Sequence, residues 1–223
     1  MKPHIYFDLD GTLTDSYEGI SNCILYAVNE LGFPHPTNDF LRHCIGPPLH
    51  ETLPMLVGKD LTAEALNLYR KRFEDVGWLE NKPYDGIYEA LESINNKNYE
   101  LFVATSKPRI MAQRIIDYFK MTPYFKRIFG SEFDGTHSSK VDLLRFAIKE
   151  NTNTSDRIMI GDRKYDLIGA ISNNMKPIGV NYGYGSIEEL SEAGAISIIE
   201  RPADLEETIK RVLNKKITSI DIR

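Results

Sequence analysis

The sequence predicts an α/β protein with a parallel sheet covered by helices on both faces. Two observations lead to this prediction. Short apolar runs of strand length alternate with amphipathic helical patterns over most of the 223 residues, as in chains that form parallel sheets. Between residues 16 and 82 the alternation stops, and only helical patterns are found. We therefore expect a doubly wound, Rossmann-like core formed by residues 1–15 and 83–223, with an all-helical domain inserted at 16–82.

Six apolar runs are expected to form the strands of the core. They are His4–Phe7, Glu100–Ala104, Arg127–Phe129, Arg157–Ile160, Pro177–Val180 and Ala195–Ile199. Apolar residues spaced three and four apart predict helices between the later strands, at Gly86–Ile94, Arg109–Phe119, Lys140–Lys149, Ile187–Ala193 and Asp204–Leu213. Because crossover connections are right-handed, the carboxyl ends of these strands are expected at one edge, where open α/β sheets bind ligands.

The inserted segment is expected to be a set of helices separated by turn residues. Helical patterns cover Tyr17–Leu31 and Ala63–Val76, and the first has an apolar stripe at Ile20, Ile24, Ala27, Val28 and Leu31. Glycines and prolines at positions 32, 34, 36 and 46–48 interrupt the pattern between these helices.

Composition excludes several classes of protein. With 42% hydrophobic residues and a net charge of −5, from 27 Lys and Arg against 32 Asp and Glu, the chain is not expected to be disordered. It has no long basic run, so we expect no nucleic-acid partner. It has no run of about 18 apolar residues, so we expect no membrane span. Cys23 and Cys44 lack C-x-x-C spacing and predict neither a zinc site nor a disulfide framework. We expect a cytoplasmic protein, either a monomer or a homodimer.

Two aspartates follow the first predicted strand, in the order Asp8-Leu9-Asp10-Gly11. Side chains at positions i and i+2 of a strand lie on one face, so Asp8 and Asp10 can reach the same pocket. Two such carboxylates repel each other unless a cation or a shared proton compensates. Mg²⁺ accepts one or two carboxylates together with substrate phosphate oxygens. Taken alone, the pair predicts a metal site and a plain acidic turn about equally.

Polar groups follow three further predicted strands and shift that balance toward a site. Thr105 and Ser106 precede a helix that Pro108 begins, and a helix N-terminus with hydroxyl and amide donors binds phosphate well. Lys140 begins the helix after the third strand, where its ammonium can neutralise a phosphoryl oxygen. After the fourth strand come Asp162 and Asp166, two carboxylates that can approach one metal ion.

Four motifs carry a resemblance to a known family: DLDGTLTDS at 8–16, the Thr105 segment, Lys140, and GDRKYD at 161–166. In that order they resemble the motifs of the haloacid dehalogenase-like hydrolase superfamily, whose helical cap domain sits where residues 16–82 stand. The segments ATSKP (104–108), GSEFDGTHSSK (130–140) and VNYGYGSIEEL (180–190) are similar to the phosphoglycolate phosphatase and 5′-nucleotidase-like branch. Ser106 stands where many relatives carry Asn.

The resemblance implies a phosphatase that hydrolyses a small phosphorylated metabolite, a nucleoside 5′-monophosphate or 2-phosphoglycolate, through an aspartyl-phosphate. Asp8 would be the nucleophile, and Asp10 the general acid and then the general base. Mg²⁺ is the implied cofactor, held by the Asp8 carboxylate, the Asp10 carbonyl and Asp162. Asp166 would support these ligands through water or a hydrogen bond.

Other residues are expected to bind the substrate without forming bonds to the reacting atoms. The resemblance implies that the phosphoryl oxygens are held by Thr105, Ser106 and Lys140. Three residues beside the turn at 46–48 are candidates for substrate contact because the cap faces the active site in relatives: Arg42, His43 and His50. The roles of the loop 182–185 and of the tail 215–223 are left open.

Two rival functions fit part of the pattern. A phosphomutase of the sugar-phosphate type shares the chemistry of Asp8 and Asp10 but must keep water away from the aspartyl-phosphate. A phospho-accepting signalling module uses an aspartate as acceptor, but it is smaller and lacks the inserted helical segment. Release of free phosphate that requires Mg²⁺ separates a phosphatase from both.

Overall fold

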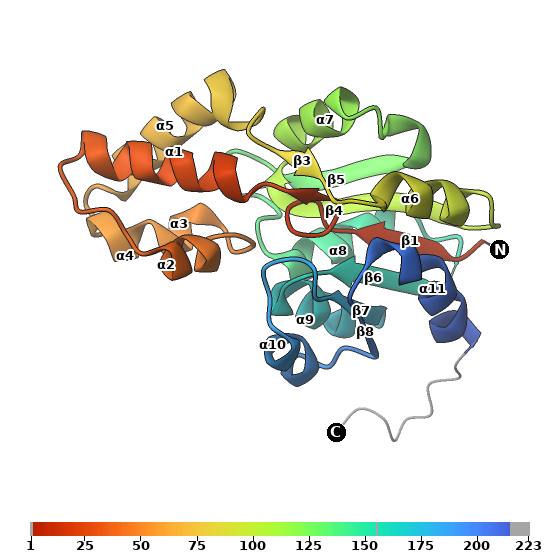
Figure 1. Cartoon of the computed structure of the whole chain (residues 1–223). Helices are drawn as coiled ribbons and strands as arrows, with labels where there is room; N and C mark the ends of the chain where they lie inside the picture. Colours follow the sequence, from red (N-terminus) through yellow and green to blue (C-terminus); the bar gives the residue numbers. More distant parts are fainter. Residues whose placement is uncertain (1, 155, 215–223) are drawn as a thin grey trace.

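The computed structural model describes residues 2–154 and 156–214 and contains a sheet of six strands whose neighbours are all parallel (Figure 1). The strand order is β5-β4-β1-β6-β7-β8. The strands are β1 (His4–Phe7), β4 (Glu100–Pro108), β5 (Arg127–Ser131), β6 (Arg157–Gly161), β7 (Lys176–Val180) and β8 (Ser197–Ile199). The predicted α/β, Rossmann-like fold is confirmed. The tail at 215–223 lies outside the described residues.

Helices cover both faces of the sheet, so the central strand β1 is buried on both sides. From β1, Ile5 and Phe7 belong to a hydrophobic core shared with α6 (Ile87–Asn95), α7 (Arg109–Tyr118) and α11 (Leu205–Asn214). Tyr6 points to the opposite face and belongs to a second core shared with α8 (Lys140–Glu150) and α9 (Lys164–Ser172). The remaining helix of this half, α10 (Ile187–Glu192), packs beside α9. Burial on both faces explains why the strands are nearly continuous apolar runs.

The strand order creates a switch point at β1. The chain continues from β4 to β5 on one side of β1 and from β6 through β7 to β8 on the other. In sheets of this order, ligands bind in the crevice at the carboxyl ends of the strands where the order reverses. Asp8 follows β1, Asp162 follows β6, and Thr105 lies in the last part of β4, so all three are at this crevice.

The inserted segment forms a helical lobe beside the sheet, at the left of Figure 1. Its α1 packs against α5 and against the π-helical turn η1 that follows α5. The elements of this lobe, in chain order, are α1 (Tyr17–Glu30), α2 (Asn38–His43), α3 (Leu49–Thr52), α4 (Pro54–Val57), α5 (Thr62–Arg72) and η1 (Phe73–Gly77).

A small antiparallel sheet joins the lobe to the core. Its strands are β2 (Thr14–Asp15) and β3 (Lys82–Pro83), with Thr14 opposite Pro83 and Asp15 opposite Lys82. The predicted domain limits at 15/16 and 82/83 fall at this sheet, which the sequence pattern did not indicate. The division into two domains itself stays a prediction.

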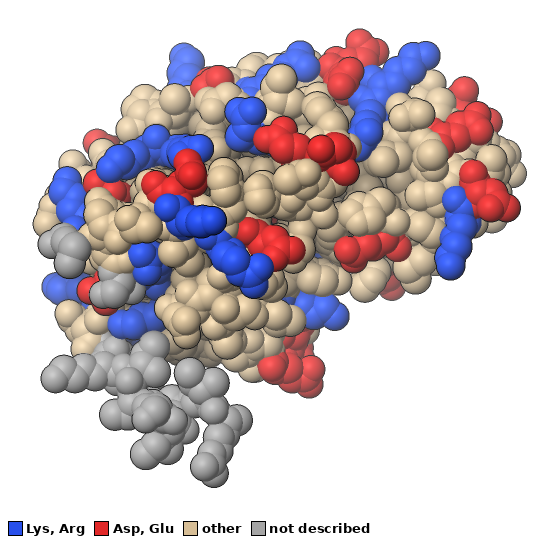
Figure 2. All heavy atoms as spheres, turned by 180° about the vertical axis from the view of Figure 1, so that it is seen from behind, with Lys and Arg blue, Asp and Glu red and all other residues tan. Residues whose placement is uncertain are grey.

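The surface carries charges of both signs. Figure 2 shows Lys and Arg side chains interspersed with Asp and Glu over the face opposite to that of Figure 1, without a broad basic area. No helix in the described part of the chain is both long enough and apolar enough to cross a membrane.

Candidate active site

Three buried carboxylates lie together at the switch point. Asp8 follows β1, Asp162 follows β6, and Asp166 is in the first turn of α9. One oxygen from each lies within 4.8 Å of the other two, and all three residues are buried. Carboxylate oxygens are the ligands that hard divalent cations prefer. The donor set therefore fits a divalent metal ion.

The ammonium group of Lys140 lies against this cluster. Its Nζ is 3.1 Å from Oδ1 of Asp8 and 2.7 Å from Oδ1 of Asp166. It also donates a hydrogen bond of 2.8 Å to the carbonyl of Ala104, which fixes the ammonium between α8 and β4. One ammonium balances one carboxylate, so with all three carboxylates ionised the cluster has a net negative charge that attracts a cation.

Burial and mutual repulsion shift the pKa values in the cluster. Burial raises the pKa of Asp8 to about 7, against the opposing charge of Lys140 and with the repulsion of Asp166 and Asp10. Burial, Asp166 and Asp8 together raise the pKa of Asp162 well above its ordinary value. For Lys140, burial alone lowers the pKa, but Asp166 and Asp8 raise it above its usual range and keep the ammonium charged.

The carboxylate of Asp162 is held in place by its neighbours. The hydroxyl of Thr12 donates to Oδ1 at 3.3 Å, and the backbone N–H of Tyr184 donates to Oδ2 at 2.9 Å. Gly11 has a φ of +83°, and a Cβ added there would lie only 2.2 Å from Oδ2 of Asp162. Glycine is required at this position because it permits both the turn and the close approach.

The end of β4 is irregular, and this irregularity fixes the positions of the polar groups there. Pairing with β5 shifts in register between Thr105 and Pro108. The hydroxyl of Ser131 donates a hydrogen bond of 2.8 Å to the carbonyl of Ser106, and the N–H of Lys107 donates one of 3.2 Å to Oγ1 of Thr105. Since this oxygen accepts a hydrogen bond from the backbone, the Thr105 hydroxyl keeps its own hydrogen to donate to a ligand.

Asp10 is paired with a residue that the sequence did not single out. Lys107 Nζ is 2.8 Å from Oδ2 of Asp10, and the two side chains are only 6% and 11% exposed. The signal available in the sequence was the position of Lys107 directly after Thr105 and Ser106. Irregularities of this kind in a strand re-aim the side chains around them. The metal role predicted for Asp10 uses its backbone carbonyl and stays a prediction.

The loop 182–185, whose role the sequence left open, connects the site to the start of the lobe. The hydroxyl of Tyr182 donates a hydrogen bond of 3.1 Å to the carbonyl of Thr12. The hydroxyl of Tyr184 accepts a hydrogen bond of 2.8 Å from the N–H of Ser16 and donates one of 3.0 Å to Oδ1 of Asp15. This loop therefore braces the residues on either side of β2.

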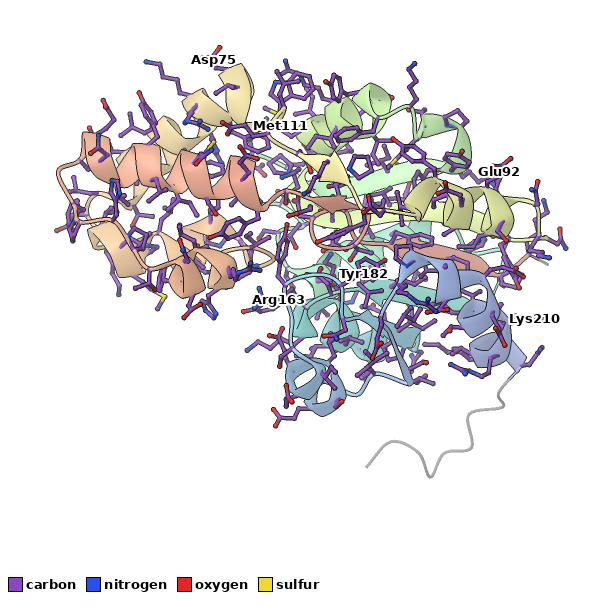
Figure 3. All side chains as sticks on the ribbon, viewed as in Figure 1. Asp75, Glu92, Met111, Arg163, Tyr182 and Lys210 are labelled. Atoms are coloured by element: carbon purple, nitrogen blue, oxygen red, sulfur yellow. The ribbon has the colours of Figure 1, made fainter. Side chains whose placement is uncertain are left out.

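A cavity of about 420 Å³ lies between the sheet edge and the lobe. Among the predicted site residues, those that line it are Asp8, Asp10, Thr105, Ser106 and His50. Arg42 and His43 are not part of its wall; Arg42 lies over the ring of Tyr17, 4.9 Å from its centre. Met111 on α7 faces the lobe (Figure 3) and belongs to the mostly apolar remainder of the wall, with Ile20, Leu66, Tyr69, Phe73 and Phe133.

Comparison with known proteins identifies the family to which this chain belongs. Residues 5–180 match the model of a family described as haloacid dehalogenase-like hydrolase. The chain belongs to the haloacid dehalogenase-like hydrolase family. The resemblance found in the motifs is therefore confirmed for residues 5–180.

Proteins similar to this haloacid dehalogenase-like hydrolase include two with the name of a nucleotidase or phosphatase and one with the name of a protein kinase. A protein named 5′-nucleotidase from Pseudomonas aeruginosa is 44% identical over 84% of this chain and 86% of its own length. The crystal structure of a predicted phosphatase from Clostridium acetobutylicum is 41% identical, with a TM-score of 0.89 over 95% of this chain and 99% of that one. A protein named tyrosine-protein kinase PtkA from Mycobacterium tuberculosis is 35% identical over 91% of this chain and 70% of its own length. The expectation of a phosphoric monoester hydrolase is confirmed at the level of the family and its named phosphatases.

Proposed function

We propose that this haloacid dehalogenase-like hydrolase is a Mg²⁺-dependent phosphatase that cleaves a small phosphate monoester through an aspartyl-phosphate on Asp8. The observation that supports this most is the meeting of groups from separate strand ends. Asp8, Asp10 and Thr105 line one cavity, and Asp8 also belongs to the buried carboxylate cluster that Lys140 contacts. This meeting supports the roles of nucleophile, proton carrier and phosphate-binding groups that we propose for these residues.

In the first step, a carboxylate oxygen of Asp8 forms a bond to phosphorus while the bond from phosphorus to the ester oxygen breaks. Asp10 gives its proton to that oxygen, so the alcohol leaves as a neutral molecule. In the second step, Asp10 takes a proton from water as the water oxygen attacks phosphorus. The bond from phosphorus to Asp8 then breaks, which releases inorganic phosphate and restores both carboxyl groups.

The remaining groups of the site balance the charge of the phosphoryl group. Lys140 and the hydroxyls of Thr105 and Ser106 hold its oxygens, and fixed donors of this kind contribute much of the rate of phosphoryl transfer. Asp8, Asp162 and the carbonyl of Asp10 would hold Mg²⁺, with Asp166 beside them. When bound, this ion neutralises charge on the phosphoryl oxygens and on the carboxylates.

The cavity favours a nucleoside 5′-monophosphate over 2-phosphoglycolate. A volume of about 420 Å³ lies within the range of pockets for ligands larger than a two-carbon acid. Tyr69, Phe73 and Phe133 give its wall aromatic rings against which a planar base can pack. The similar protein from Pseudomonas aeruginosa is itself named 5′-nucleotidase.

Phosphate release from the purified full chain tests this proposal. We expect release from p-nitrophenyl phosphate and from nucleoside 5′-monophosphates, loss of activity in EDTA, and recovery when Mg²⁺ is added. We expect Asp8→Asn to stay folded and to lose activity by about 1000-fold or more. Activity of Asp8→Asn within tenfold of the wild type, with deamidation excluded, contradicts the role of Asp8. Transfer or retention of the phosphoryl group in place of release supports the phosphomutase or the phospho-accepting signalling module.

A further inference from the structure

The pairing of Lys107 with Asp10 leaves the two carboxylate oxygens of Asp10 in different surroundings. Oδ2 lies 2.8 Å from Nζ of Lys107. Oδ1 is buried and has no hydrogen-bond partner among the described residues. Asp10 lines the cavity. A buried oxygen without a partner is costly in a protein interior, so Oδ1 is the atom expected to exchange a proton with a ligand.

Lys107 is itself held from the other side by the helical lobe. Its Nζ lies 4.6 Å from the centre of the Phe73 ring, within the range of a cation–π contact. Phe73 is the first residue of the π-helical turn η1, and its ring stacks on Tyr69 at 5.7 Å between centres. π-Helical turns inside α-helices occur frequently at functional sites. Lys107 therefore lies between a carboxylate of the core and a ring of the lobe.

The backbone around Lys107 is fixed as well. Its N–H donates to Oγ1 of Thr105, and the carbonyl of Ser106 accepts from the hydroxyl of Ser131. Gly130 on the neighbouring strand leaves room for this bulge, because a Cβ there would lie 2.7 Å from the carbonyl oxygen of Lys107. The direction of the Lys107 side chain is thus set by the strand irregularity, by Asp10 and by Phe73.

We propose that Lys107 is a positioning residue that fixes Oδ2 of Asp10 and so directs Oδ1 toward the departing ester oxygen, while Phe73 of the lobe holds Lys107 in place. This inference rests on the acid and base role of Asp10 in the proposed function. As the phosphorus–oxygen bond breaks, the proton of Asp10 moves to the ester oxygen. The ammonium of Lys107 then holds the remaining carboxylate where it can take a proton from the attacking water.

A different role for Lys107, binding of the phosphoryl oxygens, makes the opposite prediction. The described ammonium nearest to Asp8 and the carboxylate cluster is that of Lys140, at 3.1 Å from Asp8, whereas Lys107 contacts Asp10. A phosphate-binding lysine affects every substrate equally. A lysine that acts through Asp10 affects most the substrates whose leaving oxygen needs a proton.

The test compares kcat/KM for two phosphate monoesters with leaving groups of different basicity. p-Nitrophenolate leaves readily without a proton, whereas the 5′-alkoxide of a nucleoside 5′-monophosphate needs one. For Lys107→Met, which keeps the length of the side chain and removes its charge, we expect kcat/KM for the nucleotide to fall by about 10- to 100-fold. The value for p-nitrophenyl phosphate should change by less than about threefold. Lys107→Arg should restore part of the loss, and Phe73→Leu should show a weaker form of the same selectivity.

Two further variants separate the possible outcomes. For Asp10→Asn, we expect kcat/KM on the nucleotide to fall further, relative to kcat/KM on p-nitrophenyl phosphate, than it does for Lys107→Met. Lys149→Met changes an exposed residue near the end of α8 and should match the wild type. Equal losses on both substrates in Lys107→Met, or no loss on either, overturn the positioning role. If Asp10→Asn itself retains wild-type activity on the nucleotide, the proposed function fails instead, because Asp10 is then not the proton carrier.

Discussion

Asp162 is a residue of the candidate site whose buried carboxylate lowers the stability of the folded protein. It is completely buried, and its pKa is raised by burial and by the charges of Asp166 and Asp8. Removing a carboxylate from water without a cation costs free energy, and like charges add to that cost. The folded protein without metal is therefore less stable than its packing alone would make it.

We predict that Asp162→Asn raises the free energy of unfolding in EDTA by about 1–3 kcal/mol, because one of the repelling charges is removed. Urea denaturation in EDTA measures this change. Addition of Mg²⁺ should stabilise the wild type and leave the variant almost unchanged. The matched control is Asp142→Asn, an exposed residue on α8, which should alter neither value by more than about 0.5 kcal/mol. A variant that is less stable in EDTA, or that Mg²⁺ stabilises as strongly as the wild type, contradicts this account.

His4, at the other end of the sheet, is a buried ionisable residue that the chemistry does not use. It is 0% exposed, and its Nε2 lies 3.1 Å from Oε2 of Glu100. Burial lowers the pKa of His4 below its ordinary value, Glu100 and Asn153 oppose this shift, and Arg157 and Lys126 reinforce it. The folded protein therefore binds a proton at His4 less readily than the unfolded chain does.

This difference predicts how stability depends on pH. As the pH falls below about 6.5, the unfolded chain takes up a proton that the folded state resists, so the free energy of unfolding decreases. The loss approaches about 1.4 kcal/mol per pH unit until folded His4 is protonated as well. We expect wild type to lose more of its free energy of unfolding than His4→Gln does between about pH 7 and about pH 5.5, because only wild type carries the lowered pKa of His4. Urea titrations over this range measure it, with the exposed His35→Gln as control. Parallel curves for wild type and His4→Gln would rule out the effect.

At the scale of elements, the loop between α2 and α3 connects the lobe to the core through Arg163. The guanidinium of Arg163 donates to the carbonyl of Ile45, and its Nε donates a hydrogen bond of 2.9 Å to Oε1 of Glu189 on α10. Arg163 lies where the core meets the lobe (Figure 3). Gly46 has a φ of +107°, and a Cβ there would lie 2.8 Å from Cγ of Arg163. Gly46 also lines the cavity.

We predict that Gly46→Ala lowers the free energy of unfolding by about 1–3 kcal/mol, through both backbone strain and contact with Arg163. It should also lower kcat/KM, by about tenfold, because it displaces part of the cavity wall. The matched control is Gly32→Ala, since Gly32 has a φ of +74° but nothing within 4 Å of an added Cβ. Chemical denaturation and steady-state kinetics measure the two effects. Equal behaviour of the two variants in both measurements would show that Arg163 does not hold this loop.

How well each element could be predicted depends on how much of its form is local. The strands β1 and β6 are buried apolar runs, and the sequence predicts both. The strand β4 extends to Pro108, beyond the predicted end at Ala104, because its last part pairs with β5 across a register shift. That shift depends on the neighbouring strand, so the pairing of Lys107 with Asp10 could not be predicted from local pattern.

The helix α9 illustrates a second limit. The periodicity did not single it out, because Ile168 and Ile171 are exposed while Asp166 and Gly169 are buried. Asp166 is buried because it faces Lys140, and Gly169 is buried because the stem of Lys140 passes close to it. Tertiary contacts of the site therefore override the amphipathic pattern that sequence analysis relies on.

At the scale of the whole molecule, the sequence predicted the α/β fold and the edge of the sheet at which Asp8, Thr105 and Asp162 lie; the division into domains and the roles of the site residues stay predictions. The edge could be predicted because motifs at the carboxyl ends of parallel strands meet at one edge whatever the details of the loops. The cavity wall was less predictable, since Arg42 and His43 lie outside it while Arg70, Tyr69 and Phe73 from α5 and η1 line it. Those residues reach the cavity through the packing of the lobe against the core, which no local pattern encodes.

Asp8 lines the cavity and also belongs to the buried carboxylate cluster that Lys140 contacts. The central claim of the proposed function is that the phosphoryl group passes through Asp8. The stereochemical course at phosphorus tests this claim directly, whether or not the intermediate accumulates. Hydrolysis of a phosphorothioate monoester that is chiral through oxygen isotopes, carried out in isotopically labelled water, reports this course. Transfer to Asp8 and then to water is two in-line displacements and predicts net retention of configuration. Inversion of configuration would show direct attack by water and would contradict an aspartyl-phosphate on Asp8.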